Sequence, residues 1–183
     1  MKKSITSICV FCGSSASPDP AFTDGARRMG ELLAERGITL VYGAGKSGMM
    51  GALAHGALEK CGVVIGVTHK HEADHWSFQE GLERVEVLET LQQRKARMIE
   101  LADAIVVLPG GFGTLDEFSE MLAWRQIGLH DKPIALLNIK GYFDGLLTWV
   151  QRAAQEQYIR PGDMQLFFVE EDPERLLNRL RQK

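Results

Sequence analysis

An acidic pair beside a glycine-rich turn is the part of this sequence best suited to chemistry. Asp116 and Glu117 come shortly after Gly110, Gly111 and Gly113. Glycine lets the backbone approach a ligand closely, and the free N–H groups at the start of a helix attract anions such as phosphate. Cleavage of a glycosidic bond requires a carboxyl group beside the sugar, and neighbouring amides can hold a phosphate on that sugar. The segment therefore indicates a ligand that carries both a sugar and a phosphate.

A basic segment upstream of the acidic pair supplies the opposite charge. Arg94, Lys95 and Arg97 are close enough in sequence to share one helix, and as cations they can balance a phosphate. Runs of this kind are usually the solvated face of a helix, so the sequence leaves both roles open.

The acidic pair also allows a purely structural interpretation. Thr114 is a good N-cap, and a glutamate three residues later, Glu117, completes the pattern of a capping box. Thr90 and Gln93 repeat this pattern before the basic segment. Glu117 is therefore either a catalytic acid or a helix cap, and the spacing alone does not decide between them.

Glycine turns follow three of the predicted strands. They hold eight of the 19 glycines: Gly13; Gly43, Gly45, Gly48 and Gly51; and Gly110, Gly111 and Gly113. In an open parallel sheet, ligands bind outside the carboxyl ends of the strands, where the strand order reverses. The three turns thus predict a ligand site at one edge of a sheet, although glycine also makes tight turns without any ligand.

Two familiar phosphate-binding motifs do not fit these turns. Residues 43–48 have the form G-x-G-x-x-G, but the next strand ends at 66–69 without the acidic residue that binds the ribose of a dinucleotide. A P-loop needs a glycine where Leu40 stands. We therefore expect neither NAD nor a P-loop nucleotide site.

Short apolar runs alternate with longer amphipathic segments along the chain. Seven runs are predicted strands: 6–12, 38–42, 62–67, 84–88, 103–108, 133–139 and 166–169. Continuous apolar runs are typical of strands that are buried on both faces. Helices are predicted to begin at Asp19-Pro20 and Asp172-Pro173, where an N-cap precedes proline. We therefore predict one α/β domain over residues 1–183, a doubly wound parallel sheet covered by helices on both faces in three layers.

Composition and charge exclude several classes of protein. The 183 residues are 45% hydrophobic and 25% charged, which is typical of a globular protein and too apolar for a disordered chain. A net charge of -3 argues against a nucleic-acid partner. No apolar stretch is long enough to span a membrane, and the apolar run near residue 10 is too short for a signal peptide. We expect no membrane partner.

The cysteines indicate a reducing compartment. Three cysteines cannot all pair, so we expect a cytoplasmic protein. Cys9 and Cys12 have the C-x-x-C spacing of a redox or zinc motif, but they lie along an apolar strand rather than at the start of a helix. We interpret them as buried strand residues.

Four segments resemble the Lonely Guy family of phosphoribohydrolases. Residues 109–117, Pro-Gly-Gly-Phe-Gly-Thr-Leu-Asp-Glu, match the family signature P-G-G-x-G-T-x-x-E. Residues 93–98 are similar to its R-K-x-x-M element, residues 42–51 to its first glycine loop, and residues 11–15 to the end of its first strand. In order and spacing, the resemblance covers nearly the whole chain.

The resemblance implies a Rossmann-like fold, usually a homodimer, that needs no cofactor. It also implies hydrolysis of the N-glycosidic bond of a nucleoside 5′-monophosphate, either AMP or an N6-modified AMP such as a cytokinin riboside 5′-monophosphate, to free base and ribose 5-phosphate. Arg94 and Glu117 would be the catalytic pair: Glu117 would stabilise the positively charged sugar and direct water, and Arg94 would offset charge on the phosphate or on the leaving base. The implied substrate-binding residues are Gly13, Ser14, Gly43, Gly45, Lys95, Gly110, Gly111, Phe112, Gly113, Thr114 and Asp116.

The chain also departs from the family pattern. Ala44 replaces the middle glycine of the first loop, Asp116 stands where glutamate is common, and the loop 68–76 replaces an Ile-Pro segment. These departures leave the preferred base open. His69, His71 and His75 with Asp74 offer metal ligands, but a polar loop with chance histidines is the favoured interpretation, so we expect no metal site.

Two alternatives to hydrolysis stay open. The family has also been labelled lysine decarboxylase, a reaction that needs pyridoxal phosphate on a Schiff-base lysine; Lys46 and Lys95 are candidates by location, but no partner for the pyridinium nitrogen is evident. A nucleotide-binding module without catalysis would use Glu117 only as a helix cap.

The predicted helix over 118–127 offers a candidate dimer surface. Met121, Leu122 and Trp124 are bulky apolar residues within it. Together with the resemblance, they predict a homodimer.

Overall fold

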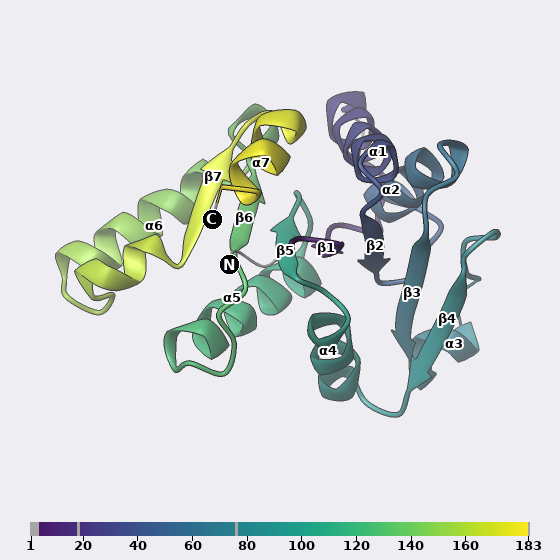
Figure 1. Cartoon of the computed structure of the whole chain (residues 1–183). Coiled ribbons are helices and arrows are strands. Elements are labelled where there is room, and N and C mark those ends of the chain that lie inside the picture. The colour runs from purple at the N-terminus through teal and green to yellow at the C-terminus, as the bar shows by residue number, and fades with distance from the viewer. Residues whose placement is uncertain (1–3, 18, 76, 183) are drawn as a thin grey trace.

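The computed structural model describes residues 4–17, 19–75 and 77–182. Its centre is a sheet of seven parallel strands in the order β4-β3-β2-β1-β5-β6-β7 (Figure 1). The strands are β1 (Ser7–Phe11), β2 (Thr39–Tyr42), β3 (Val64–His69), β4 (Arg84–Leu88), β5 (Ala104–Val107), β6 (Ile134–Leu137) and β7 (Phe167–Glu170). All seven predicted strands are confirmed, each within two residues of its expected bounds or slightly shorter.

The strand order reverses between β1 and β5. The chain runs outward from β1 through β2 and β3 to β4, then returns to pair β5 with the free side of β1 and continues to β6 and β7. Such a reversal is the topological switch point at which doubly wound sheets bind ligands. Because the first and third glycine turns follow β1 and β5, the fold brings them together at this point.

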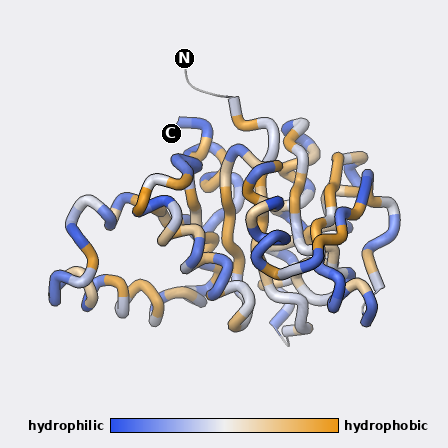
Figure 2. The backbone as a smooth tube through the Cα atoms, turned by 90° about the horizontal axis from the view of Figure 1, so that it is seen from below, coloured by the Kyte–Doolittle hydropathy of each residue, from blue (hydrophilic) through white to orange (hydrophobic). Residues whose placement is uncertain are grey.

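Helices cover both faces of the sheet, as predicted. One face carries α1 (Pro20–Glu35), α2 (Gly48–Glu59) and α7 (Pro173–Leu180). The other carries α4 (Leu91–Glu100), α5 (Phe112–Gln126) and α6 (Asp144–Gln155). The short helix α3 (Lys70–His75) follows β3, and two 3-10 turns, η1 (Ile139–Gly141) and η2 (Pro161–Gln165), follow β6 and precede β7. Figure 2 shows apolar strands between the more polar outer segments.

The alternation of side chains along β1 divides the core into two clusters. Ile8 and Val10 pack with the first set of helices, whereas Cys9 and Phe11 pack with the second. Both faces of β1 are therefore buried, which explains its continuous apolar sequence. Cys9 and Cys12 are free and buried, which confirms that they are strand and core residues.

Local capping explains where several helices begin. The carboxylate of Asp19 accepts a hydrogen bond from the N–H of Ala21, and that of Asp172 accepts one from Arg175. Both predicted starts are confirmed, as is the capping box of Thr90 at the start of α4. In the part of the chain that is described, no helix is long and apolar enough to cross a membrane.

The start of α5 corrects one prediction. The helix begins at Phe112 with Gly111 as its N-cap, so the capping box of Thr114 and Glu117 is wrong. Thr114 is buried against Gly110, where any side chain would overlap the Thr114 side chain. Because this contact places Thr114 inside the first turn, Glu117 is not held at the helix end and its carboxylate is left for another role.

Candidate active site

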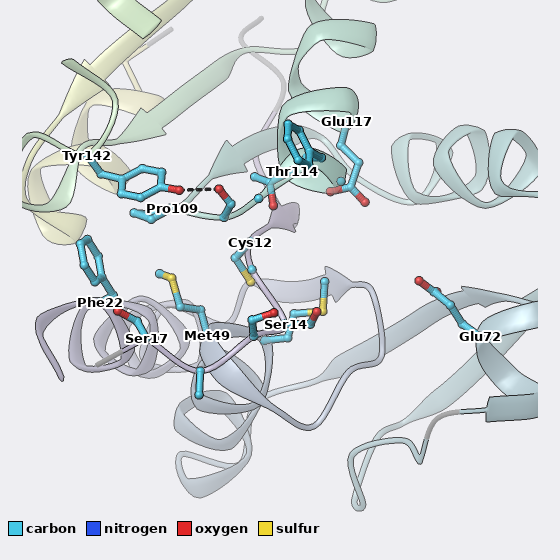
Figure 3. A pocket seen from close by; sticks show the side chains of 18 of the residues that line it. Cys12, Ser14, Ser17, Phe22, Met49, Glu72, Pro109, Thr114, Glu117 and Tyr142 are labelled. Atoms are coloured by element: carbon cyan, nitrogen blue, oxygen red, sulfur yellow. Dashed lines mark hydrogen bonds between the residues drawn. The ribbon is translucent and has the colours of Figure 1, made fainter. Parts of the chain in front are cut away.

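A cavity of about 540 Å³ opens at the switch point, beyond the carboxyl ends of β1 and β5. Its walls come from the turn after β1, the start of α2, the turn after β5 with the first turns of α5, and side chains of α3 and α4. Figure 3 shows Ser14 and Met49 facing Pro109 and Thr114 across the space. Two of the three predicted glycine turns therefore line one cavity.

Backbone hydrogen bonds join the walls of the cavity. The N–H of Gly13 donates to the carbonyl of Pro109 at 3.0 Å, and the carbonyl of Gly13 accepts from the N–H groups of Met49 and Met50 at 3.1 and 3.2 Å. A Cβ at position 13 would lie 3.1 Å from the Cα of Gly110. Glycine is required here because the two loops pack closely.

The start of α5 has the character of an anion site. The amides of Phe112, Gly113 and Thr114 are the first N–H groups after the N-cap Gly111, and such groups have no carbonyl partner within their own helix. The helix dipole adds positive potential at the same place. All four residues line the cavity, together with Gly13, Ser14 and Gly110. Seven of the predicted substrate-binding residues are thus brought together.

Arg94 and Glu117 form a buried ion pair at this cavity. Nη1 of Arg94 lies 3.3 Å from Oε1 of Glu117, and their side chains are only 5% and 6% exposed. Nε of Arg94 donates to the carbonyl of Val67 at 3.1 Å, which orients the guanidinium from the end of β3. A side chain at Gly43 would overlap the guanidinium, so this glycine makes room for Arg94. The fold therefore brings the predicted catalytic pair together.

Burial dominates the acid–base behaviour of the site. It raises the pKa of Glu117 to about 7, with smaller contributions from the charges of Asp116 and Glu72 and an opposing one from Arg94. A carboxyl group with a pKa near neutrality can hold or release a proton at working pH. Burial also raises the pKa of the Cys12 thiol, which therefore lines the cavity as a neutral group.

A second ion-pair cluster lies beside the first. It is formed by Lys95 and Asp116, the sequence neighbours of Arg94 and Glu117, together with Glu120. Nζ of Lys95 is 2.8 Å from both Oδ2 of Asp116 and Oε2 of Glu120. Burial lowers the pKa of Lys95, but hydrogen bonds to these two carboxylates outweigh burial and leave the pKa raised. Neither Lys95 nor Asp116 is among the described residues that line the cavity. These two predicted substrate-binding residues contact each other instead.

The basic segment is not the solvated helix face that such runs usually form. Arg94 and Lys95 are buried, and that interpretation is wrong for both. Arg97 is partly exposed and pairs with Glu86, with 2.7 Å between Nε and Oε2.

The glycines of the second turn are not among the described residues that line the cavity, although Met49 and Met50 of the same segment are. Gly43 packs on Arg94, and Gly45 lines a smaller hollow together with Ser14, Lys46 and Ser47. Ala44 has a φ of 63°, in the left-handed region that favours glycine. The alanine therefore keeps the backbone shape for which the family uses glycine.

Glu72 is a cavity residue that sequence reasoning missed. Its Oε2 accepts a hydrogen bond from Oγ1 of Thr68 at 2.9 Å and lies 3.9 Å from Nε of Arg94. The signal that could have identified it is its position directly after β3, at the same edge of the sheet as the glycine turns.

Tyr142 is a second missed residue. Its hydroxyl donates to the carbonyl of Gly110 at 2.6 Å, and its ring packs edge-on against Phe22, which also lines the cavity. Tyr142 follows β6, so it too belongs to the carboxyl edge of the sheet.

The histidines of the loop after β3 lie on or next to α3. The rings of His71 and His75 have centroids 4.6 Å apart, and Nδ1 of His69 lies 3.2 Å from Oε2 of Glu72. Among the described residues, no group of three or more His, Cys, Asp or Glu side chains is arranged to hold a metal ion. Trp76, in the same loop, lies outside the described residues.

The two candidate lysines do not fit a Schiff base with pyridoxal phosphate. Lys95 is held by two carboxylates away from the cavity, and its pKa is raised, whereas a Schiff-base lysine must reach the cofactor as a neutral amine. Lys46 is exposed and lines only the smaller hollow.

The candidate dimer surface on α5 is smaller than expected. Met121 is fully buried in the core, so it is not available to a partner, and Leu122 and Trp124 are partly buried against the same core. The exposed apolar side chains of α5 and its following turn are Phe112, Leu115, Ile127 and Leu129.

A parallel, doubly wound sheet with a glycine-lined cavity at its switch point defines a Rossmann-like α/β protein. Residues 50–180 match the family model described as "Possible lysine decarboxylase". With this match and the relatives below, the chain belongs to that family, the Lonely Guy family that its motifs predicted.

Two plant proteins illustrate the relationship. The chain is 39% identical over 173 residues to the "Probable cytokinin riboside 5′-monophosphate phosphoribohydrolase LOGL6" of Oryza sativa subsp. japonica, covering 94% of this chain and 69% of the relative. It is 42% identical over 154 residues to the "Cytokinin riboside 5′-monophosphate phosphoribohydrolase LOG1" of Arabidopsis thaliana, covering 84% of this chain and 72% of the relative.

Solved structures support the fold. The molybdenum cofactor binding protein of Rippkaea orientalis superposes with a TM-score of 0.74 at 21% identity, over 99% of this chain and 98% of that one. At this identity the likeness concerns the fold alone, and it confirms the Rossmann-like architecture.

Proposed function

We propose that this protein hydrolyses the N-glycosidic bond of a nucleoside 5′-monophosphate, either AMP or an N6-modified AMP such as a cytokinin riboside 5′-monophosphate. The products are the free base and ribose 5-phosphate. The observation that carries the proposal is the buried pair of Arg94 and Glu117, which borders a cavity with a helix N-terminus in its wall. The names of the plant relatives support the same reaction.

The phosphate binds at the start of α5. The amides of Phe112, Gly113 and Thr114 donate to its oxygens, and the hydroxyl of Ser14 faces them across the cavity. Carboxylates repel the phosphate, so it binds at the amides rather than beside Glu117. This arrangement holds the sugar with its glycosidic bond toward the ion pair.

Hydrolysis breaks the bond between C1′ and the base nitrogen, and the electron pair of that bond leaves with the base. Water adds its oxygen to C1′, and its protons end on the new sugar hydroxyl and on the departing base. Glu117 stabilises the positive charge that builds on the sugar and directs the water. With a pKa of about 7, it can also take the proton of the water and pass it on.

Arg94 acts on the negative charge of the reaction. Its Nε is engaged by the carbonyl of Val67, and its Nη1 faces Glu117, so the guanidinium is held in one orientation. A fixed cation at the cavity offsets charge on the leaving base or on the phosphate as the bond breaks. The reaction needs only water and the nucleotide, and we propose no cofactor.

A nucleotide-binding module without catalysis is the second candidate. It depended on Glu117 serving as a helix cap, and no such capping bond is present at the start of α5. A buried carboxyl with a raised pKa beside a cavity is typical of an active site rather than of a structural position.

The direct test is product analysis. Purified protein is incubated separately with AMP, isopentenyl-AMP, GMP and CMP, and the mixtures are separated by chromatography. We expect ribose 5-phosphate and free base in equal amounts from at least one nucleotide. The absence of ribose 5-phosphate from all four would contradict the proposal, and binding without release would favour the non-catalytic module.

We further propose that the protein works in the cytoplasm as a homodimer. Phe112, Leu115, Ile127 and Leu129 give α5 and its following turn an exposed apolar surface, which supports association of two copies. Solution scattering should give twice the mass of one chain, and a monomeric mass at working concentration would contradict the dimer. Fractionation of cells should recover the protein with cytoplasmic markers.

A further inference from the structure

The cavity wall near Arg94 carries a second carboxylate that the proposed reaction does not use. Glu72 lines the cavity, and its side chain is 18% exposed. Its Oε2 lies 2.9 Å from Oγ1 of Thr68, 3.2 Å from Nδ1 of His69 and 3.9 Å from Nε of Arg94. Oε1 makes no hydrogen bond with the part of the chain that the structure describes. One oxygen is anchored, and the other is left for a ligand.

Charge decides which part of a nucleotide meets Glu72. The phosphate is attracted to the amides at the start of α5 and repelled by carboxylates. Glu117 and Glu72 both approach the guanidinium of Arg94, and Figure 3 shows the two carboxylates at one end of the cavity, with Tyr142 at the other. The sugar and the base, which carry no negative charge, therefore occupy the end with the two carboxylates.

We propose that Glu72 determines which base is accepted, by taking a hydrogen bond from an amino group on the base. The inference rests on the proposed function and names its substrate class: nucleoside 5′-monophosphates with an amino group on the edge facing Glu72, as adenine has at position 6. A carboxylate can only accept hydrogen bonds, so a carbonyl at the same position, as in hypoxanthine, is repelled.

Substitution of Glu72 by glutamine reverses the hydrogen-bonding preference without changing the size of the side chain. The hydroxyl of Thr68 donates to Oε2, and the positive charge of Arg94 lies 3.9 Å from it, so the amide oxygen takes that place. The amide NH₂ group then faces the base as a donor. Glu72→Gln should therefore favour a carbonyl over an amino group.

The test compares AMP with inosine 5′-monophosphate, which differ at position 6, on the wild type, Glu72→Gln and Glu89→Gln. Glu89 is the control, because it is 74% exposed and pairs with Lys70 at 3.6 Å, outside the described lining of the cavity. We expect the wild type and the control to prefer AMP about tenfold or more in kcat/KM, as expected for a hydrogen bond to a charged group. In Glu72→Gln the ratio should fall to about one or below.

The ratio compares two substrates on one enzyme, so a general loss of activity in a variant cancels. Equal use of both nucleotides by the wild type, or an unchanged ratio in Glu72→Gln, would overturn the inference. The same comparison made by calorimetric binding of the two nucleotides to the wild type needs neither turnover nor a variant. If the wild type binds AMP more tightly than inosine 5′-monophosphate but releases no product, the proposed hydrolysis is wrong. The role of Glu72 in recognising the base is then still supported.

Discussion

Two ion pairs join α4 to α5 at adjacent positions, and they differ in what surrounds them. Arg94 with Glu117 borders the cavity, whereas Lys95 with Asp116 and Glu120 lies beside it. Both cations are buried. Lys95 has two carboxylates within 2.8 Å, and Asp116 is 53% exposed, so water and lysine together stabilise its charge.

The carboxylate charge of the pair at the cavity is less well stabilised by its surroundings. Glu117 is buried, and its pKa is raised to about 7 although Arg94 lies 3.3 Å away. Burial of the acid, rather than the type of residue, therefore distinguishes a group that can exchange a proton with a ligand from one that only holds two helices together.

Substitution of each cation should show most clearly that the two ion pairs differ in function. Arg94→Met should lower kcat/KM for AMP by about 10²–10³-fold, because it removes a fixed cation that acts in the transition state. Lys95→Met, at the next position on the same helix, should retain activity within about threefold, since Lys95 lies outside the cavity lining. Steady-state kinetics on both variants checks this, and equal losses would show that the two pairs do not differ in role.

The raised pKa of Glu117 should appear in the stability of the protein. Because the pKa rises from 4.5 to about 7 on folding, the folded state binds the proton more tightly. This contribution is present at low pH and is lost as the pH rises from about 4.5 to 7. Over that range the free energy of unfolding of the wild type should fall by about 3 kcal/mol relative to that of Glu117→Gln. Urea unfolding of both proteins at several pH values measures it; a constant difference would indicate that Glu117 has an ordinary pKa.

Lys95 should matter to stability rather than to turnover. Lys95→Met leaves Glu120 and Asp116 without their cation, but both carboxylates keep some contact with water. We expect a loss of about 1–2 kcal/mol in the free energy of unfolding, less than for a fully buried pair. Chemical denaturation tests this value, and a variant as stable as the wild type would show that Lys95 does not stabilise the fold.

Asp116 should have the smallest effect. Its carboxylate is half exposed, and Glu120 remains bonded to Lys95 when Asp116 is changed. Asp116→Asn should therefore lower the free energy of unfolding by at most about 0.5–1 kcal/mol. The rate of AMP hydrolysis should stay within about twofold of the wild-type rate. A large loss of activity in the same assay would place Asp116 at the substrate after all.

Local signals in the sequence predicted the sheet and the place of the cavity. Continuous apolar runs such as 104–108 mark strands buried on both faces, and the glycines after β1 and β5 mark a close approach of two loops. These features depend on neighbouring residues only, and the fold confirms them.

Tertiary packing decided what the sequence could not. Thr114 is a better N-cap than Gly111 by type, yet it contacts Gly110 and the helix begins three residues earlier than a Thr114 N-cap predicts. Arg94 and Lys95 are consecutive and point in directions about 100° apart on a helix. Which of them faces the cavity depends on how α4 is rotated against the sheet, and no local pattern records that rotation.

The claim that only the cavity pair is catalytic is tested most directly by Glu117→Gln and Glu120→Gln, measured for both AMP binding and AMP turnover. In Glu117→Gln we expect AMP to bind within about threefold of the wild type while turnover falls by about 10³-fold. Glu120→Gln, whose residue contacts Lys95, should bind and hydrolyse AMP nearly as the wild type does. Hydrolysis at close to the wild-type rate by Glu117→Gln would show that Glu117 is not a catalytic residue.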